Sequence, residues 1–187
     1  VFILAADDID AVLPTIRSRS RLLRVGVPSK EDALAWLSTQ KRLKGDPEVA
    51  LAMAGGAPLN AVKDITGLTL DAKASATLRD LLARGRSLTP DSIVRGYSAS
   101  MGIPAVALYL SRWCYDLLRV KSGAEPHFFI REKDVLEKIA ADATMKNLLS
   151  LNAAVAEMRR SAEHPLAPRQ VWEGVLLVYV RALGGQV

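Results

Sequence analysis

The residues that start and stop helices divide most of this chain into helix-sized segments. Asp46 precedes Pro47 and Thr89 precedes Pro90, so at both places a capping side chain stands before a proline that suits the first helical turn. Glycines close several of the segments. We therefore predict a mainly helical fold from Pro28 onward, with helices over about 30–42, 47–55, 58–65, 69–84, 89–99, 103–120, 131–141, 144–161 and 168–183.

Two helical domains are expected from these lengths. The three short helices between residues 29 and 68 are the size of one small bundle, and residues 69–187 form a second, longer domain of five or six antiparallel helices. The last helix is apolar over much of its circumference, so it is covered by its own chain or by another chain. Its Trp172 and Tyr179 are candidate contacts with another chain, although an ordinary internal core explains the same pattern.

The first 28 residues differ from the helical remainder. Val1–Ala6 is a short, continuous apolar run that ends in two aspartates, which is typical of a buried parallel strand. We expect one helical turn over Ile9–Leu13, stopped by Pro14, and a second short strand over residues 21–28. A parallel strand needs partners that arrive through crossover connections. We therefore expect residues 1–28 to be the end of an α/β unit that begins upstream.

An arginine cluster lies between the two predicted strands. Leu13–Arg24 contains four arginines, of which Arg17, Arg19 and Arg21 occupy alternate positions. A guanidinium is always charged and its planar fork matches the oxygens of a phosphate, so an extended segment with this spacing suits an anionic partner. A solvated edge strand, protected from aggregation by its charges, is the alternative.

The sequence contains few groups that could catalyse a reaction. Asp7 and Asp8 follow the first predicted strand, but no Gly-Lys-Ser/Thr phosphate loop precedes them. His127 and His164 are far apart and each lies in a predicted loop, so a metal pair is not expected. Cys114 lies in an apolar helix, where we expect a buried, inert thiol. We therefore expect no catalytic activity, metal or cofactor in this chain.

The overall composition adds weaker constraints. The net charge of +5 allows an acidic partner, but outside the first cluster the basic residues are dispersed. No apolar run is long enough to span a bilayer. The single cysteine permits no internal disulfide, which fits a reducing compartment, so we expect a cytoplasmic protein.

The surroundings of the arginine cluster resemble the Ser-Arg-Cys region of DNA polymerase clamp loader subunits, which belong to the AAA+ proteins. The residues that carry the resemblance are Leu13-Pro14-Thr15-Ile16-Arg17 followed by Ser18-Arg19-Ser20, placed before a proline-ended strand that leads into helices. Ser20 stands where the family usually has cysteine, but both are small and the charge is on Arg19. The resemblance covers essentially all 187 residues, in layout more than in motif beyond this region. It is greatest to the bacterial delta-prime branch of the DNA polymerase III clamp loader.

The resemblance implies a three-part architecture. Residues 1–28 would be the C-terminal end of an AAA+ nucleotide-binding core, residues 29–68 a three-helix lid, and residues 69–187 a collar that joins other subunits in a ring. The implied partners are the gamma or tau ATPase subunits and the delta subunit, and through them the sliding clamp and primed DNA. ATP would be bound by the neighbouring subunits, with no cofactor in this chain and no contact with a membrane.

The same resemblance assigns roles to the arginine cluster. It implies that Arg19 is an arginine finger, which reaches the γ-phosphate of ATP bound by an adjoining subunit. It also implies that Ser18 and Thr15 hold the loop, whereas Arg17 and Arg21 supply interfacial contacts.

The start of the third short helix bears on ATP hydrolysis. In relatives that hydrolyse ATP, a glycine there is followed three residues later by an arginine that reaches the phosphates. The matching positions here are Gly56 and Leu59, and a leucine cannot donate to a phosphate, which favours the delta-prime branch. Two alternatives remain open: the C-terminal part of an ATP-hydrolysing gamma or tau subunit, and an independent basic helical module that binds DNA.

Overall fold

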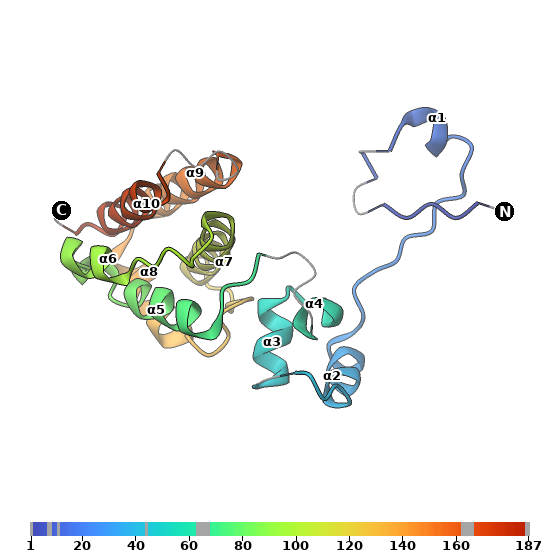
Figure 1. Cartoon of the computed structure of the whole chain (residues 1–187), viewed down its shortest axis with the longest axis horizontal. Helices are drawn as coiled ribbons and strands as arrows, with labels where there is room; N and C mark the ends of the chain where they lie inside the picture. Colours follow the sequence, from blue (N-terminus) through green and yellow to red (C-terminus); the bar gives the residue numbers. More distant parts are fainter. Residues whose placement is uncertain are drawn as a thin grey trace.

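The computed structural model describes residues 2–6, 9–10, 12–43, 45–62, 68–161 and 167–185, and over these ranges the chain is mainly helical (Figure 1). The predicted fold class is confirmed, because each of the nine predicted helices is present with ends that differ by a few residues. The elements are α1 (Pro14–Arg17), α2 (Lys30–Ser38), α3 (Pro47–Met53), α4 (Pro58–Val62), α5 (Ala72–Leu82), the 3-10 helix η1 (Gly85–Ser87), α6 (Pro90–Gly96), α7 (Ile103–Lys121), α8 (Lys133–Asp142), α9 (Met145–Ser161) and α10 (Pro168–Ala182). The described ranges contain no β-strand.

Helices α2, α3 and α4 form a small bundle with its own buried core. Ser29 caps α2, since its Oγ accepts a hydrogen bond from Asp32 N (3.1 Å). Asp46 caps α3 in the same way, accepting a bond from Glu48 N (2.9 Å). The Asp46 cap was predicted from the sequence. The core consists of Ala33, Leu37 and Leu51, against which Leu34, Leu43, Ala61 and Val62 pack.

The chain leaves α3 through two glycines, where the sequence predicts a stop. Gly55 and Gly56 have φ angles of 66° and 84°, a left-handed conformation that glycine adopts without a steric penalty from a Cβ atom. A Cβ on Gly56 would lie 3.2 Å from Val27 Cγ1. The absence of a side chain here therefore also leaves room for the segment that enters α2.

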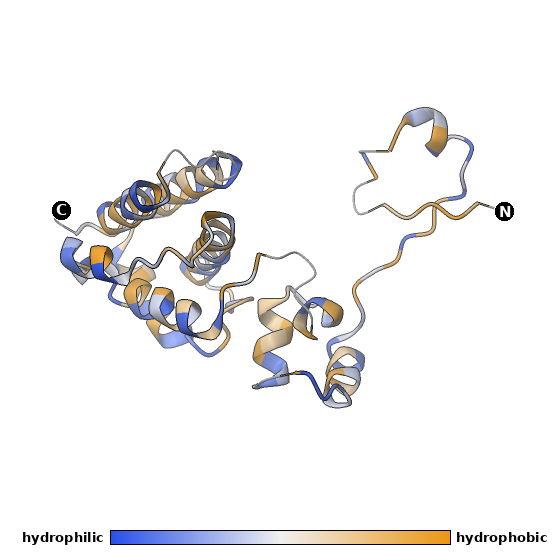
Figure 2. Cartoon of the chain, in the orientation of Figure 1, coloured by the Kyte–Doolittle hydropathy of each residue, from blue (hydrophilic) through white to orange (hydrophobic). Residues whose placement is uncertain are grey.

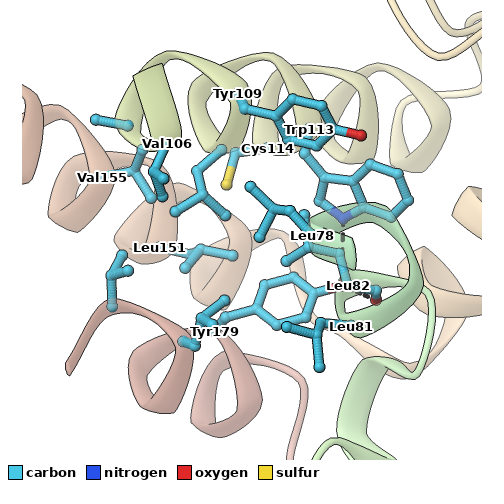
Figure 3. Packing of buried hydrophobic residues seen from close by; sticks show 14 of the residues in the cluster. Leu78, Leu81, Leu82, Val106, Tyr109, Trp113, Cys114, Leu151, Val155 and Tyr179 are labelled. Atoms are coloured by element: carbon cyan, nitrogen blue, oxygen red, sulfur yellow. Dashed lines mark hydrogen bonds between the residues drawn. The ribbon is translucent and has the colours of Figure 1, made fainter. Parts of the chain in front are cut away.

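Helices α5 to α10 form a larger bundle around α7. Helix α7 packs against α8 and α9, while α10 packs against α9 and also contacts α6 and η1. Most of the circumference of α7 is covered, and Tyr115, at 44%, is its most exposed residue. Figure 3 shows the apolar side chains that fill the space between these helices.

Two aromatic side chains on α10 make hydrogen bonds inside this core. The Tyr179 hydroxyl donates to Leu82 O (2.7 Å) and accepts from Trp113 Nε1 (3.2 Å) (Figure 3). Burial raises the pKa of the Tyr179 hydroxyl, which therefore remains protonated as the donor. Trp172 Nε1 donates to Ile93 O (2.9 Å). Among the described residues, every buried side-chain nitrogen or oxygen atom thus has a hydrogen-bond partner.

The interpretation of Trp172 and Tyr179 as contacts with another chain is wrong. Both side chains are fully buried in the larger bundle, and their hydrogen bonds are internal. The apolar circumference of α10 is explained by its neighbours in the same chain, α6, α7, α9 and η1.

The prediction of strands in the first 28 residues is also wrong. Residues 2–6 and 21–28 have no strand partner among the described residues, and Phe2 and Ile3 are 98% and 92% exposed. Figure 2 shows the hydrophobic stretches of this segment lying apart from the helical bundles. A strand is stabilised by pairing with a neighbouring strand. The described part of the chain supplies no strand that could pair with these residues. Val1 lies outside the described residues.

The helical turn near the N-terminus lies after Pro14, whereas we predicted it before this residue. Helix α1 begins at Pro14 because proline suits the first helical position, where its missing N–H would have had no partner in the helix. The sequence prediction treated this proline as a stop.

The two bundles meet at an ion pair. Arg131 Nη2 lies 2.7 Å from Asp46 Oδ2 and 3.8 Å from Glu48 Oε2. The hydrogen bond from Arg131, helped by the one from the Glu48 amide, lowers the pKa of Asp46 below its ordinary value. Beside this pair the Gly55 backbone lies close to the Phe128 ring, since a Cβ on Gly55 would lie 3.7 Å from Phe128 Cε1.

Removing the Tyr179 hydroxyl tests the importance of the buried hydrogen bonds. Tyr179→Phe leaves the Trp113 N–H and the Leu82 carbonyl without their partner in apolar surroundings, so we expect the free energy of unfolding to fall by about 1–3 kcal/mol. Urea unfolding followed by circular dichroism measures the change. Tyr115→Phe removes an exposed hydroxyl and is the matched control, with an expected change under about 0.5 kcal/mol. Equal losses in the two variants would contradict the prediction.

The ion pair between the bundles predicts that the pKa of Asp46 depends on the guanidinium group of Arg131. The pKa of Asp46 lies below 3.8 in the folded chain, and Arg131→Ala should move it up toward 3.8. Because the pKa is lower in the folded than in the unfolded chain, this contact contributes stability above about pH 4 and loses it as the pH falls through the folded-state pKa.

NMR titration of the Asp46 carboxyl carbon measures this shift. Arg95→Ala breaks a different exposed ion pair, with Asp91 (3.0 Å), and should leave the Asp46 midpoint unchanged. An Asp46 midpoint that does not respond to Arg131→Ala would show that the pair has no influence in solution.

Candidate functional site

The arginine cluster begins in α1 and continues through a hydrogen-bonded turn. Arg19 N donates to Ile16 O (3.2 Å). The Ser18 hydroxyl donates to Thr15 O (3.2 Å), and the Ser20 hydroxyl donates to Ile16 O (2.8 Å). Carbonyl groups at the end of a helix lack partners in the helix, and these short side chains supply them. Serines on both sides of Arg19 therefore fix the turn that presents it.

The four arginines have different surroundings. Arg17 Nη1 lies 3.2 Å from Asp10 Oδ1 in an exposed ion pair. Arg19, Arg21 and Arg24 are also exposed, but they make no ion pair with a residue that the structure describes. With respect to the described residues, these three guanidinium groups are therefore available to an anionic partner, whereas Arg17 already has a counter-charge.

The predicted row of arginines along one extended segment is not formed. Arg17 ends α1, Arg19 lies in the following turn, and Arg21 lies after this turn in a segment without regular secondary structure. Alternate residues share a face only in a strand, so the three guanidinium groups do not form one continuous edge. Arg19 differs from Arg17 and Arg21 because it lies in the turn that the Ser18 and Ser20 hydroxyls hold.

Exposed apolar side chains accompany the arginine cluster. Leu23 and Val25 are 83% and 89% exposed, and Leu22 and Val27 beside them are also uncovered. Uncovered apolar residues mixed with arginines are typical of surfaces that bind another protein. The segment is therefore suited to a protein surface that also presents negative charge.

Chemically, the cluster can stabilise negative charge on a group that another molecule supplies. The described residues contain no group of three or more His, Cys, Asp or Glu side chains that could hold a metal ion. Cys114 is buried as predicted, and burial raises the pKa of its thiol to about 12, so the thiol is protonated at neutral pH. His127 is exposed in the loop before α8, and Asp7, Asp8 and His164 lie outside the described residues.

The sequence prediction missed the structural role of Asp116. Its carboxylate is fully buried and accepts hydrogen bonds from the backbone N–H groups of His127, Phe128 and Phe129 at 2.7–2.8 Å. A buried carboxylate is stable only when such donors surround it. The available signal was a lone aspartate inside the apolar run of α7, where a charged residue needs an explanation.

Two clefts lie away from the arginine cluster. The first, of about 440 Å³, lies between α5 and α6, where Arg95 and Asp91 on its wall pair with each other (3.0 Å). The second, of about 300 Å³, lies where the bundles meet, and its Lys30 and Glu48 are likewise paired (2.5 Å). Arg84, which also lines the first cleft, donates to Ser92 Oγ (2.7 Å) and shares the cleft with Asp80 and Asp91, so the arginine cluster remains the better candidate for binding an anion.

No protein-family model matches this chain, and no curated protein matches it. None of the helices within the described ranges is both long and apolar enough to cross a bilayer. Function is therefore inferred from the site's own geometry and from the sequence pattern around Arg19.

Proposed function

We propose that this chain is a subunit of a DNA polymerase III clamp loader, of the delta-prime type, which supplies an arginine finger to a neighbouring ATPase subunit. The observation that carries the proposal is Arg19, exposed on a turn that hydrogen bonds from Ser18 and Ser20 hold in place. In that assembly the chain works in the cytoplasm and takes part in the ATP-driven loading of the sliding clamp during DNA replication.

Arg19 is suited to act on a phosphate that belongs to another subunit. In phosphoryl transfer, negative charge spreads over the γ-phosphate oxygens in the transition state, and an arginine supplied from a partner stabilises it. Arg19 needs to break no internal ion pair to do so, because it has none among the described residues. Arg17, paired with Asp10, and Arg21 add positive field and interfacial contacts rather than chemistry.

The two helical bundles support the same proposal. In it, the small bundle is the lid, within residues 29–68, and the larger bundle is the collar, within residues 69–187. Leu59, near the start of α4, is 62% exposed and offers no donor to a phosphate. The proposed chain therefore leaves ATP binding and hydrolysis to its neighbours, which are gamma or tau subunits.

The proposal needs a surface for the other collar domains. Trp172 and Tyr179 are internal, so this surface is assigned instead to exposed apolar residues on α9 and α10, namely Met145, Leu149 and Val178. The gamma or tau subunits and the delta subunit bind there and at the arginine cluster. The sliding clamp and primed DNA are reached through those partners.

Substitution of Arg19 in a reconstituted loader tests the proposal. We expect Arg19→Ala to lower clamp- and DNA-stimulated ATP hydrolysis at the adjoining site by about 10³- to 10⁵-fold, because a finger of this kind has that effect in comparable reactions. Single-turnover hydrolysis measures the loss, and size-exclusion chromatography shows whether the assembly stays intact.

Two control variants make this test specific. Arg42→Ala removes an equal charge from an exposed position between α2 and α3, outside the arginine cluster, and should leave hydrolysis nearly unchanged. Arg19→Lys keeps the charge but lacks the planar fork, so it should not restore the rate. Unchanged hydrolysis in an intact assembly that carries Arg19→Ala would overturn the proposal.

A further inference from the structure

Three aromatic rings and two guanidinium groups gather on the surface of the larger bundle, and we call this group the aromatic platform. Tyr115 and Phe128 have ring centroids 5.6 Å apart, and His127 lies 4.7 Å from Phe128 and 6.2 Å from Tyr115. Arg112 Cζ lies 5.5 Å from the Phe128 centroid, and Arg119 Cζ lies 5.7 Å from the Tyr115 centroid. The platform therefore combines flat aromatic rings with planar cations in one place.

The platform rests on a rigid base. Asp116, fully buried in α7, accepts hydrogen bonds from the backbone N–H groups of His127 and Phe128 (both 2.8 Å) and of Phe129 (2.7 Å). Phe129 is buried beneath the loop with its ring 4.8 Å from that of Trp113. Because the loop is already held by these contacts, a ligand that binds on the rings has little conformational entropy to remove.

Core packing does not account for Tyr115. It is 44% exposed, whereas its neighbours along α7 on both sides, Cys114 and Asp116, are buried. Large aromatic rings that remain accessible beside cations are suited to binding a ligand with flat, electron-rich groups. Tyr115 is thus an accessible ring on a helix that otherwise belongs mostly to the core.

The charges around the platform favour an anionic ligand. Arg119 makes no ion pair within the described part of the chain, and its Nε donates only to a backbone carbonyl, Glu125 O (2.8 Å). The Glu125 carboxylate is paired with Lys133 Nζ (2.6 Å), and the Asp116 carboxylate is occupied by three backbone N–H groups. The nearby acidic groups therefore leave the positive charge of Arg119 uncompensated.

We infer that the aromatic platform binds single-stranded nucleic acid, with bases stacked on Tyr115 and His127 and a backbone phosphate beside Arg119. Stacking on aromatic side chains combined with a cationic track is how proteins bind single strands without sequence preference. In a duplex the faces of the bases are already stacked on each other, so the single strand is the form that fits. An acidic peptide would match the charge but would leave the accessible rings without a partner. This inference does not depend on the proposed function of Arg19.

The test uses the full chain and a fluorescein-labelled oligothymidylate, with binding measured by fluorescence anisotropy. Tyr115→Leu should weaken binding by roughly tenfold, because a stacked base is lost, whereas Tyr115→Phe keeps the ring and should bind like the original chain. Both variants leave the net charge unchanged, so binding through the exposed arginine cluster alone would not distinguish them. Tyr115 is a surface residue, and circular dichroism shows whether each variant is folded.

Two further measurements separate stacking from simple charge attraction. An abasic strand of equal length should bind more weakly and should not respond to Tyr115→Leu. Arg119→Ala should reduce the dependence of log affinity on log salt by about 0.7, the value expected for one phosphate contact on a single strand. Arg181→Ala, on an exposed part of α10, is the charge-matched control and should leave that dependence unchanged.

Two results would overturn the inference. One is equal affinity of Tyr115→Leu and Tyr115→Phe for oligothymidylate. The other is displacement of the oligothymidylate by polyglutamate of equal charge as effectively as by unlabelled oligothymidylate, which would assign the platform to an acidic peptide. Neither measurement involves ATP or a partner subunit, so both are independent of the outcome for Arg19.

Discussion

The Tyr179 hydroxyl connects three helices of the larger bundle at a point that water does not reach. It joins α10 to Leu82 at the end of α5 and to Trp113 on α7, so each helix depends on the position of the other two. A buried polar atom without a partner would destabilise the core, and this arrangement leaves none. The larger bundle therefore needs no other chain to complete its core, in contrast with residues 2–6 and 21–28, whose apolar side chains are uncovered.

Helix positions could be predicted well because helix ends are set by local chemistry. Ser29, Asp46 and Thr89 each accept a hydrogen bond from a backbone N–H two or three residues ahead, and Pro47 and Pro90 occupy the first helical turn. Pro14 was misinterpreted because proline is compatible with both the end and the beginning of a helix. The choice depends on the residues that follow, and here they continue into α1.

The sequence could not show what covers an apolar surface. Val1–Ala6 and α10 are both strongly apolar, yet residues 2–6 are exposed and Trp172 and Tyr179 are enclosed by their own chain. Hydrophobic pattern identifies a face to be buried, but the identity of its neighbour depends on tertiary structure. The sequence motif singled out Arg19 as a candidate, and the structure shows this residue exposed, whereas no sequence pattern pointed to the base of the aromatic platform. The carboxylate of Asp116 holds a loop eleven to thirteen residues away, a distance that no local pattern encodes.

The central claim is that residues 14–24 form an interface that is completed by a neighbouring subunit carrying ATP. Amide hydrogen exchange, measured by mass spectrometry on the chain alone and in the assembled loader with and without ATP, tests this claim most directly. We predict slower exchange over residues 14–24 in the assembly, slowest when ATP is bound, while exchange in the core of α7 stays the same. Equally fast exchange over residues 14–24 in the free chain and in the ATP-loaded assembly would contradict the claim.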